Sequence, residues 1–165
     1  MGLVMRIALI AKPGHEDTGI GRYTAQLQKT FEEMGHEVLV VHPTIPLPAG
    51  LLRIVKQFLG WDLKAFFANY PVWIRYPQAD IYHLVGQNLA IIMILKKPPG
   101  KTVVTVHDII PWLVRDDMEL RVYRHLIEKW FDWLAIASLK HTDLLIADSV
   151  STKNSLRQVQ LRNTK

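Results

Sequence analysis

The segment DTGIGRY, Asp17–Tyr23, has residue types and spacing that suit anion binding. Gly19 and Gly21 stand between an apolar run and a helical pattern, and Arg22 follows them. Glycines at such a turn let the backbone approach an anion, and the first N–H groups of the following helix point at it. The alternative, that the two glycines only shape a tight turn between a strand and a helix, stays open, since glycine punctuates turns of every kind.

A histidine and an aspartate, His107 and Asp108, follow directly after the apolar run Thr102–Val106. Histidine can donate to a sugar hydroxyl or a phosphate, or exchange a proton near neutral pH. The aspartate can orient that imidazole or accept from a hydroxyl. A structural alternative is a turn that Asp108 closes ahead of Pro111, because aspartate is a common turn residue.

A further set of polar residues lies at the end of the third apolar run, in the segment ADIYHLVGQN, where His83 is the first of them. Gly86, Gln87 and Asn88 come next, and the two amides are plausible contacts to a ligand. The turn at the start of a helix explains these three residues equally well.

Five short apolar runs rich in Val, Ile and Leu position these residues, and none alternates strictly with polar residues. They are Met5–Ala11, Glu37–Val41, Ile81–Val85, Thr102–Val106 and Leu144–Ala147. Such strands are typical of a parallel sheet covered by helices on both faces. With helical patterns between them, they predict an α/β fold with a doubly wound parallel sheet of about five strands. Ligands bind such a sheet at the carboxyl ends of its strands, where both groups of residues fall.

Three helical segments have clear signals. Apolar residues of the first recur at spacings of three and four: Ile20, Tyr23, Leu27, Phe31 and Met34. Gly35 then predicts a left-handed residue after its last turn. A long helix is predicted from about Met118 to Leu139, and a final helix from an N-cap at Ser149 or Ser151.

Known nucleotide motifs do not fit the glycine turn. A dinucleotide site requires a third glycine or alanine and an acidic residue at the end of the second strand. Here Thr24 follows the glycines, and the second strand ends in VLVVHPT, with His42 and no acid nearby. A phosphate-binding loop requires G-K-[ST], which is missing. A nucleotide-dependent oxidoreductase is therefore disfavoured.

Composition sets further limits. The chain of 165 residues has no cysteine, which excludes disulfides, thiol nucleophiles and cysteine zinc sites. No H-E-x-x-H pattern or helical pair of histidines with a carboxylate predicts a metal site. A net charge of +5 favours anionic ligands or an anionic membrane surface. The basic residues are too sparse for a nucleic-acid track, and no apolar run reaches the roughly 18 residues of a spanning helix.

Gly50–Asp80 is both basic and aromatic. Its first part, GLLRIVKQFLG, mixes apolar residues with Arg53 and Lys56, and its second part interleaves aromatic residues with Lys64 and Arg75. Basic residues beside aromatic ones suit a membrane interface. The same pattern also suits a helix pair that packs onto the sheet.

Four segments, in order, resemble the N-terminal domain of a GT-B fold glycosyltransferase of family 4, a retaining group that uses nucleotide sugars. They are TGIGRYTAQLQKTFEEMGHEVLVV, ADIYHLVG, KTVVTVHDIIP and HTDLLIADSVSTKNSL. The resemblance covers nearly the whole chain and implies that residues 1–165 are one Rossmann-like, acceptor-side domain. The family's C-terminal donor-binding domain, with its E-x7-E motif, is absent from these residues.

The resemblance also implies roles at the glycine turn. Gly19 and Gly21 would contact the donor diphosphate through backbone N–H groups. Arg22 would help with that charge or with the acceptor. Thr18 stands where the family has the first glycine of a pair.

Further roles follow for the other strand ends. His107 would lie beside the transferred sugar and form the catalytic pair with Asp108. His83, Gln87 and Asn88 are the candidates for acceptor binding. The nucleotide sugar is the donor substrate, and no cofactor or metal is implied.

The function that these features imply is transfer of a sugar from a nucleotide sugar to an unknown acceptor, in carbohydrate metabolism. Many acceptors in the family are lipid-linked, and the region equivalent to Gly50–Asp80 often lines the acceptor site. The expected location is the cytoplasm, with peripheral contact to the inner face of the membrane. A non-catalytic binding module of the same fold and an oxidoreductase are the alternatives. The missing C-terminal domain is an expected partner, and nucleic acid is not.

Overall fold

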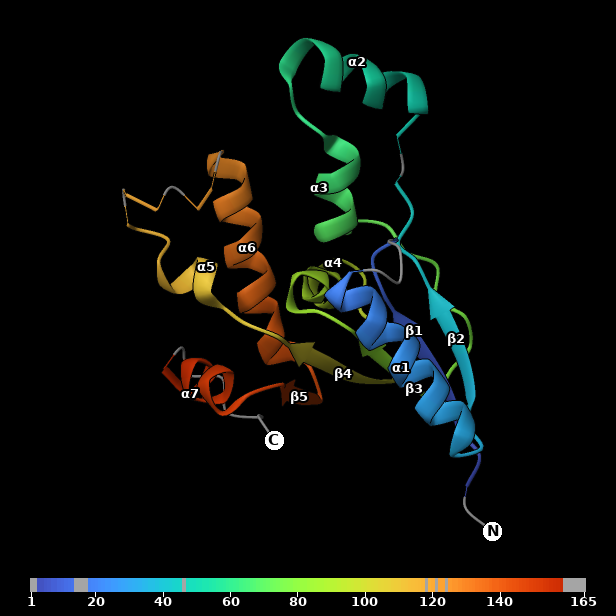
Figure 1. Ribbon diagram of the computed structural model, residues 1–165. Coiled ribbons are helices and arrows are strands. Elements are labelled where there is room, and N and C mark those ends of the chain that lie inside the picture. The colour runs from blue at the N-terminus through green and yellow to red at the C-terminus, as the bar shows by residue number, and fades with distance from the viewer. Residues whose placement is uncertain are drawn as a thin grey trace.

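The computed structural model describes residues 3–13, 18–45, 47–117, 119–120, 122–123 and 125–158, and its strands form one parallel sheet (Figure 1). The strand order is β2-β1-β3-β4-β5. The bounds are β1 Arg6–Ile10, β2 Glu37–Val41, β3 Ile81–Leu84, β4 Lys101–Val106 and β5 Leu144–Ala147. All five predicted strands and the doubly wound fold class are confirmed.

The sheet core is apolar on both faces, as the uninterrupted Val, Ile and Leu runs predict. In β1, every residue after Arg6 is buried, and Ile7 pairs with Val38 of β2 and with Ile81 of β3. Strand β4 pairs with β3 and β5 and is buried at most positions. The carboxyl ends of these strands therefore share one edge of the molecule.

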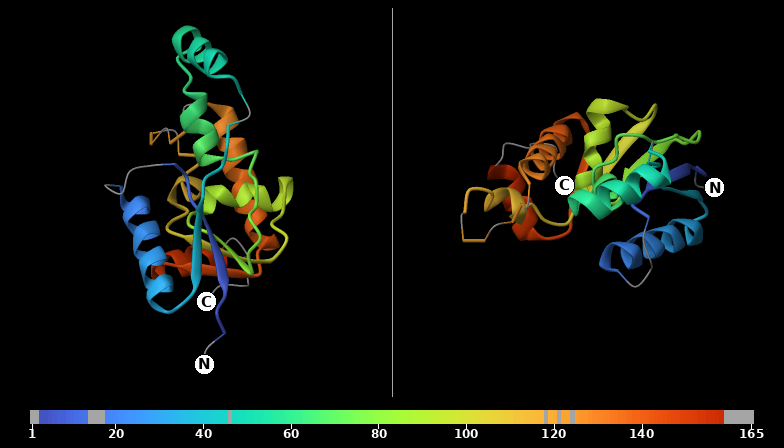
Figure 2. Two further views of the ribbon diagram at one scale, coloured as in Figure 1. Left: turned by 90° about the vertical axis from the view of Figure 1, so that its right-hand side faces the viewer. Right: turned by 90° about the horizontal axis from the view of Figure 1, so that it is seen from above.

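Helices cover both faces of the sheet. They are α1 Gly19–Glu33, α2 Ala49–Leu59, α3 Leu63–Asn69, α4 Ile92–Leu95, α5 Ile110–Leu113, α6 Leu126–Ser138 and α7 Val150–Gln158, with short 3₁₀ turns η1 Gln87–Ile91 and η2 Leu139–His141. In Figure 2, α1 lies on one face of the sheet, and α4 and α6 lie on the other. No helix among the described residues is long and apolar enough to cross a bilayer.

The first helix, α1, follows its sequence signals closely. Thr18 is the N-cap, and its hydroxyl accepts a hydrogen bond from the amide of Gly21 at 3.0 Å. The predicted apolar face packs against the core through Tyr23 and Leu27, among others. Gly35 follows the last turn with φ 85°, which confirms the predicted left-handed residue.

The helix predicted from Met118 to Leu139 is wrong in its first part. Met118 lies outside the described residues, and the structure has short α5 and then α6, which begins only at Leu126. Among the described residues between them, Tyr123 lies in the loop, where its hydroxyl donates to the carboxylate of Asp132. The backbone N–H of His125 then donates to Glu128 at 3.3 Å, which starts α6 with a capping interaction.

The segment Gly50–Asp80 resolves into two helices with different environments. Phe66 of α3 is buried, and its ring packs on Phe131 of α6 with centroids 4.9 Å apart, so α3 is a packed helix. By contrast, α2 has no buried residue and stands away from the sheet beyond α3 (Figure 1). The prediction that both helices pack onto the sheet is therefore wrong for α2, while α3 packs against α6.

The last helix, α7, begins at Val150. The amide of Thr152 donates to the hydroxyl of Ser149 at 3.0 Å, so Ser149 rather than Ser151 caps this helix. Residues after Gln158 lie outside the described part of the chain.

Candidate functional site

Two adjoining cavities lie at the carboxyl ends of the strands. The turn cavity, of about 420 Å³, is lined by Thr18 and Gly21 of the glycine turn and by His42 after β2. The His107 cavity, of about 220 Å³, is lined by His107 and Asp108 after β4 and by Gly86, Gln87 and Asn88 after β3. Both cavities are also lined by Lys12, Ile20 and Asn69, so the glycine turn and the His-Asp pair face one continuous groove.

Ile20 and Gly21 of the glycine turn line this groove, whereas Gly19, one residue earlier, lines neither cavity. Gly19 does not have a positive φ, and a Cβ atom built there would meet nothing within 4 Å among the described residues. Neither backbone conformation nor packing therefore requires glycine at position 19. The amides of Gly19 and Ile20 have no acceptor within the helix, whereas that of Gly21 already donates to Thr18. An anion would reach Gly21 only by replacing that contact.

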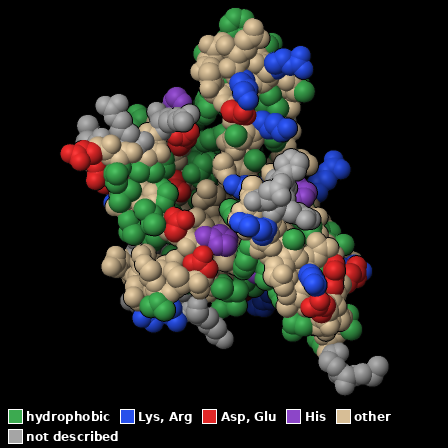
Figure 3. All heavy atoms as spheres, in the orientation of Figure 1, with side chains coloured by type: hydrophobic (Ala, Val, Ile, Leu, Met, Phe, Trp, Pro, Cys, Tyr) green, Lys and Arg blue, Asp and Glu red, His purple; other side chains and the backbone are tan. Residues whose placement is uncertain are grey.

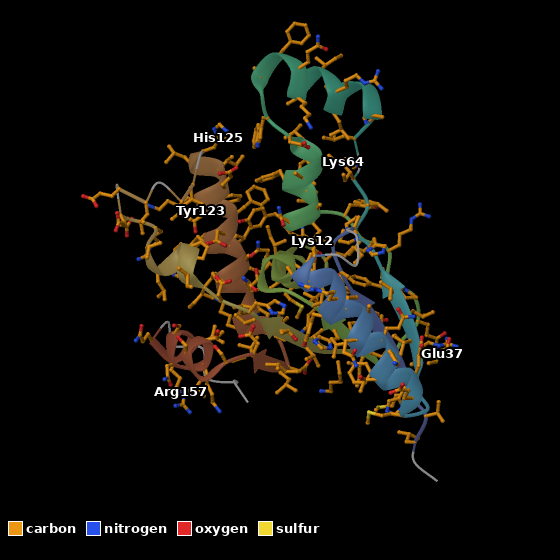
Figure 4. The ribbon with its side chains drawn as sticks, in the orientation of Figure 1. Lys12, Glu37, Lys64, Tyr123, His125 and Arg157 are labelled. Carbon is orange, nitrogen blue, oxygen red and sulfur yellow. The ribbon has the colours of Figure 1, made fainter. Side chains whose placement is uncertain are left out.

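Arg22 does not line either cavity. It lies exposed on α1, one residue beyond Gly21. Among the described residues, the lysine or arginine that lines the groove is Lys12, two residues after β1, which was not predicted from the sequence. Its ammonium group donates to the side-chain oxygen of Asn69 at 3.3 Å, and Figure 4 shows it between α3 and the start of α1. Lys12 could have been predicted from the sequence, since it directly follows the apolar run Met5–Ala11 and so lies at the ligand edge of the sheet.

His107 is held by acceptors on both sides of its ring. Its Nε2 lies 2.8 Å from the carbonyl oxygen of Val85, and its Nδ1 lies 3.1 Å from a carboxylate oxygen of Asp148. A carbonyl oxygen only accepts, so Nε2 carries a hydrogen and donates to Val85. The contact with Asp148 becomes an ion pair when Nδ1 is protonated as well. The ring also meets the ring of Tyr23 edge-on, with centroids 5.1 Å apart.

This arrangement limits what His107 can do. Its side chain is 23% exposed and lines the cavity, but both ring nitrogens already have partners. A hydrogen bond from the ring to a sugar would therefore have to replace the contact with Val85 or with Asp148. Asp148 follows directly after β5, and strand-end reasoning would have found it had that strand been searched for polar residues.

Asp108 and the amides lie where the sequence predicts them. Asp108 lines the cavity, and its carboxylate accepts from the amide of Ile110 at 3.2 Å, which agrees with the turn interpretation, while its catalytic role stays a prediction. Gln87 accepts from the amide of His107 at 3.3 Å, which ties the two strand ends together. Asn88 lines the same cavity.

His83 is not brought together with these residues. It is 4% exposed, lines neither cavity, and its Nε2 lies 2.8 Å from the hydroxyl of Thr105, which in turn lies 2.9 Å from that of Tyr23. Burial lowers the pKa of His83 to about 4. The prediction that His83 contacts an acceptor is therefore wrong in this structure. It is a neutral histidine within the sheet.

On the surface, charged groups of both signs meet at the groove. Figure 3 shows a His side chain at the centre of the face, with acidic and basic side chains beside it. The same view shows Lys and Arg side chains among hydrophobic ones over α2 and the upper part of α3.

Comparison with known proteins identifies a family and a set of similar structures. The model of a family described as Glycosyltransferase Family 4 matches residues 18–165. No curated protein matches the chain. An α-glucosyltransferase in complex with UDP and a 13-mer DNA containing an HMU base is 15% identical, with a TM-score of 0.49 over 98% of this chain and 41% of that chain. An α-glucosyltransferase in complex with UDP-glucose and DNA containing an abasic site is 17% identical, with a TM-score of 0.49 over 98% of this chain and 40% of that one. This chain thus spans about two fifths of the length of those proteins.

Proposed function

The chain belongs to glycosyltransferase family 4, whose model covers residues 18–165, and from this premise we propose that it forms the acceptor-side half of a retaining glycosyltransferase. The donor is a nucleotide sugar, which is a substrate, and no further cofactor is proposed. In the reaction, the bond from the sugar C1 to the diphosphate oxygen breaks, and a bond from C1 to an acceptor hydroxyl oxygen forms. The nucleoside diphosphate leaves, and its oxygen takes up the proton that the acceptor hydroxyl gives up.

The observation that carries this proposal is the continuity of the groove. The glycine turn and the His-Asp pair line neighbouring cavities that share Lys12 and Asn69. A diphosphate held by the first amides of α1 and by Lys12 would bring the attached sugar toward His107. A cationic group near the leaving diphosphate stabilises the charge that develops as the bond breaks.

A binding module without catalysis is the remaining alternative, and family membership leaves the oxidoreductase alternative without support. The DNA in the two solved α-glucosyltransferase structures is a feature of those proteins. The proposal keeps the expectation that this chain has no nucleic-acid partner.

The experiment that tests the proposal is titration of the chain with UDP-glucose, followed by the amide resonances of Gly19 and Ile20. We expect both resonances to shift with UDP-glucose and not with uridine, which lacks the diphosphate. Lys12→Ala should weaken the response. Lys29→Ala, on the exposed side of α1, should leave it unchanged. Equal shifts with uridine, or none with UDP-glucose, would count against a diphosphate at the turn.

A peripheral contact with an anionic membrane is a second proposal, which rests on α2. This helix has no buried residue, and the segment from Pro48 to Trp61 contains no acidic residue. An exposed apolar face with basic residues beside it suits the interface of a membrane that contains anionic lipids.

A further inference from the structure

A third cavity shares lining residues with the groove. We call it the Asp132 cavity. Its volume is about 220 Å³, far above the roughly 10–15 Å³ that one water needs. Its polar lining includes Tyr70 directly after α3, Gln87 and Asn88 after β3, Asp108 after β4, and Asp132 of α6. It shares Gln87, Asn88 and Asp108 with the His107 cavity, so a ligand here would reach the proposed reaction centre.

Asp132 is a buried carboxyl group with little internal support. It is only 6% exposed, and among the described residues its carboxylate receives one hydrogen bond, from the hydroxyl of Tyr123. Burial raises the pKa of Asp132, while the Tyr123 hydroxyl lowers it in part. Buried carboxylates usually have several partners, because an unpaired buried charge is costly. Asp132 lines the cavity, so its carboxylate can also accept from a donor of a ligand bound there.

Tyr70 has an unused hydroxyl beside this carboxylate. Its ring packs against Phe66 and Phe131, but within the described part of the chain its hydroxyl forms no hydrogen bond. Burial raises the pKa of Tyr70, and the charge of Asp132 raises it further, which indicates that the two groups are close. A half-buried phenol without a partner loses a hydrogen bond that water or a ligand would supply.

We infer that the Asp132 cavity binds the hydroxyl-bearing part of the acceptor, a sugar or cyclitol ring, with Asp132 accepting from one hydroxyl and Tyr70 donating to another. This inference rests on the proposed function and adds the acceptor class to it. Each hydroxyl of such a ring both donates and accepts. The cavity lining also offers both hydrogen-bond donors and acceptors. Asp132 accepts, and the Tyr70 hydroxyl can donate or accept. The NH₂ group of Gln87 can donate, because its oxygen already accepts from the amide of His107. An ammonium ligand would offer no acceptor to Tyr70 or Gln87.

Two variants and two probes test this inference on the chain itself. The probes are myo-inositol, which has a hydroxyl on every ring carbon, and cyclohexanol, which has a ring of the same size with one hydroxyl. Saturation-transfer NMR titration measures the affinity of each. We expect myo-inositol to bind and cyclohexanol to bind much more weakly. Tyr70→Phe should lower the myo-inositol affinity by about 3- to 10-fold, and Asp132→Asn by about 10-fold or more, since the hydrogen bond to a charged group is the stronger.

Controls separate binding from folding. Asp116→Asn makes the same chemical change in the α5–α6 loop, where the side chain is 72% exposed and outside the cavity, and should leave binding unchanged. Tyr70→Phe removes a hydroxyl that no described residue uses, so its melting temperature should match the wild type. If Asp132→Asn melts early, Tyr70→Phe alone decides. Wild-type affinity in Tyr70→Phe, or equal binding of both probes, would overturn the inference. Absence of myo-inositol binding would overturn it too, and the UDP-glucose response of Gly19 then shows whether the proposed function survives.

Discussion

His107 has a position that makes two roles possible, one in the reaction and one in the fold. Its ring nitrogens contact Val85 and Asp148, and its carbonyl oxygen accepts from the hydroxyl of Thr152 at 2.8 Å. In an active two-domain enzyme that carries this domain, we expect His107→Ala to lower kcat by about 10²–10³, the usual cost of losing a positioned donor at a developing charge. Initial rates and thermal melts of the same preparation measure the two roles separately.

His42 provides the control for this substitution. It also ends a strand at the same edge, lines the turn cavity and contacts the carbonyl oxygen of Ala11 at 2.9 Å. It matches no motif of the family, so His42→Ala should reduce kcat much less. A near-normal kcat in His107→Ala would show that the assigned role is wrong. A loss of rate that follows early melting would assign His107 to the fold instead.

His83 should make the chain sensitive to mild acid. Its pKa is about 4 in the folded chain, lowered by burial from the ordinary 6.5. Below pH 6.5, His83 takes up a proton in the unfolded chain but not in the folded chain. The free energy of unfolding therefore falls as the pH drops from 6.5 toward 4. The difference corresponds to about 3 kcal/mol at most. Urea unfolding at pH 7 and pH 4.5 should show this loss in the wild type.

The variant His83→Gln removes the titrating group and keeps a side chain able to bond Thr105. We expect its unfolding free energy to change less between the two pH values than that of the wild type, even if it is lower at pH 7. An equal acid dependence in both proteins would mean that other groups cause it.

For single residues, the sequence predicted which ones lie at the strand ends, but not how deeply their side chains are buried. The position of His107 and Asp108 at the groove could be predicted because residues that follow strand ends lie at the ligand edge of such a sheet. His83 was misjudged because its strand ends one residue later, and the hydroxyl of Thr105 from the next strand holds its side chain inside the sheet. The burial of Asp132 was not predicted, because a carboxylate within a helical pattern is expected to face solvent unless tertiary contacts are known.

Among the elements, α2 has the most testable surface. Its apolar residues Leu51, Ile54 and Phe58 recur at helical spacing and are all exposed, while Arg53 and Lys56 occupy the opposite side. We expect the chain to sediment with phosphatidylglycerol vesicles at low salt and to be released from them by added salt. It should not sediment with phosphatidylcholine vesicles.

A matched pair of variants isolates the helix. Phe58 and Val150 are each 76% exposed, but Phe58 lies on α2 and Val150 at the start of α7. Phe58→Ser should weaken sedimentation with the anionic vesicles, whereas Val150→Ser should not. If both variants sediment like the wild type, or if neutral and anionic vesicles retain the chain equally, α2 is not the contact.

Element boundaries followed local signals wherever such signals were strong. The apolar runs gave all five strands within a residue or two, and Gly35 ended α1 as predicted. The helix expected from Met118 began late because tertiary contacts override the periodic pattern. Tyr123 bonds the carboxylate of Asp132 from the loop, and His125 begins α6 with its own cap. Neither contact is visible in a periodic pattern.

For the whole molecule, we expect the 165 residues by themselves to transfer no sugar. In the family, a second domain provides most of the donor contacts and the basic residues on the phosphates, and stabilisation of developing charge is usually the largest part of catalysis. Incubation of the purified chain with labelled nucleotide sugars and a panel of sugar and lipid acceptors tests this directly. Any labelled product above the level of a His107→Ala preparation would contradict the prediction.

The strand order also has a consequence for synthesis on the ribosome. Strand β1 leaves the ribosome before β2 and β3, yet in the sheet it lies between them, with Ile7 paired to Val38 on one side and to Ile81 on the other. At about 5–20 residues per second, one apolar edge of β1 therefore waits several seconds for its partner after β2 has joined. An unpaired apolar edge is where nascent chains aggregate, so during translation this stage is the one at which a chaperone would protect the chain.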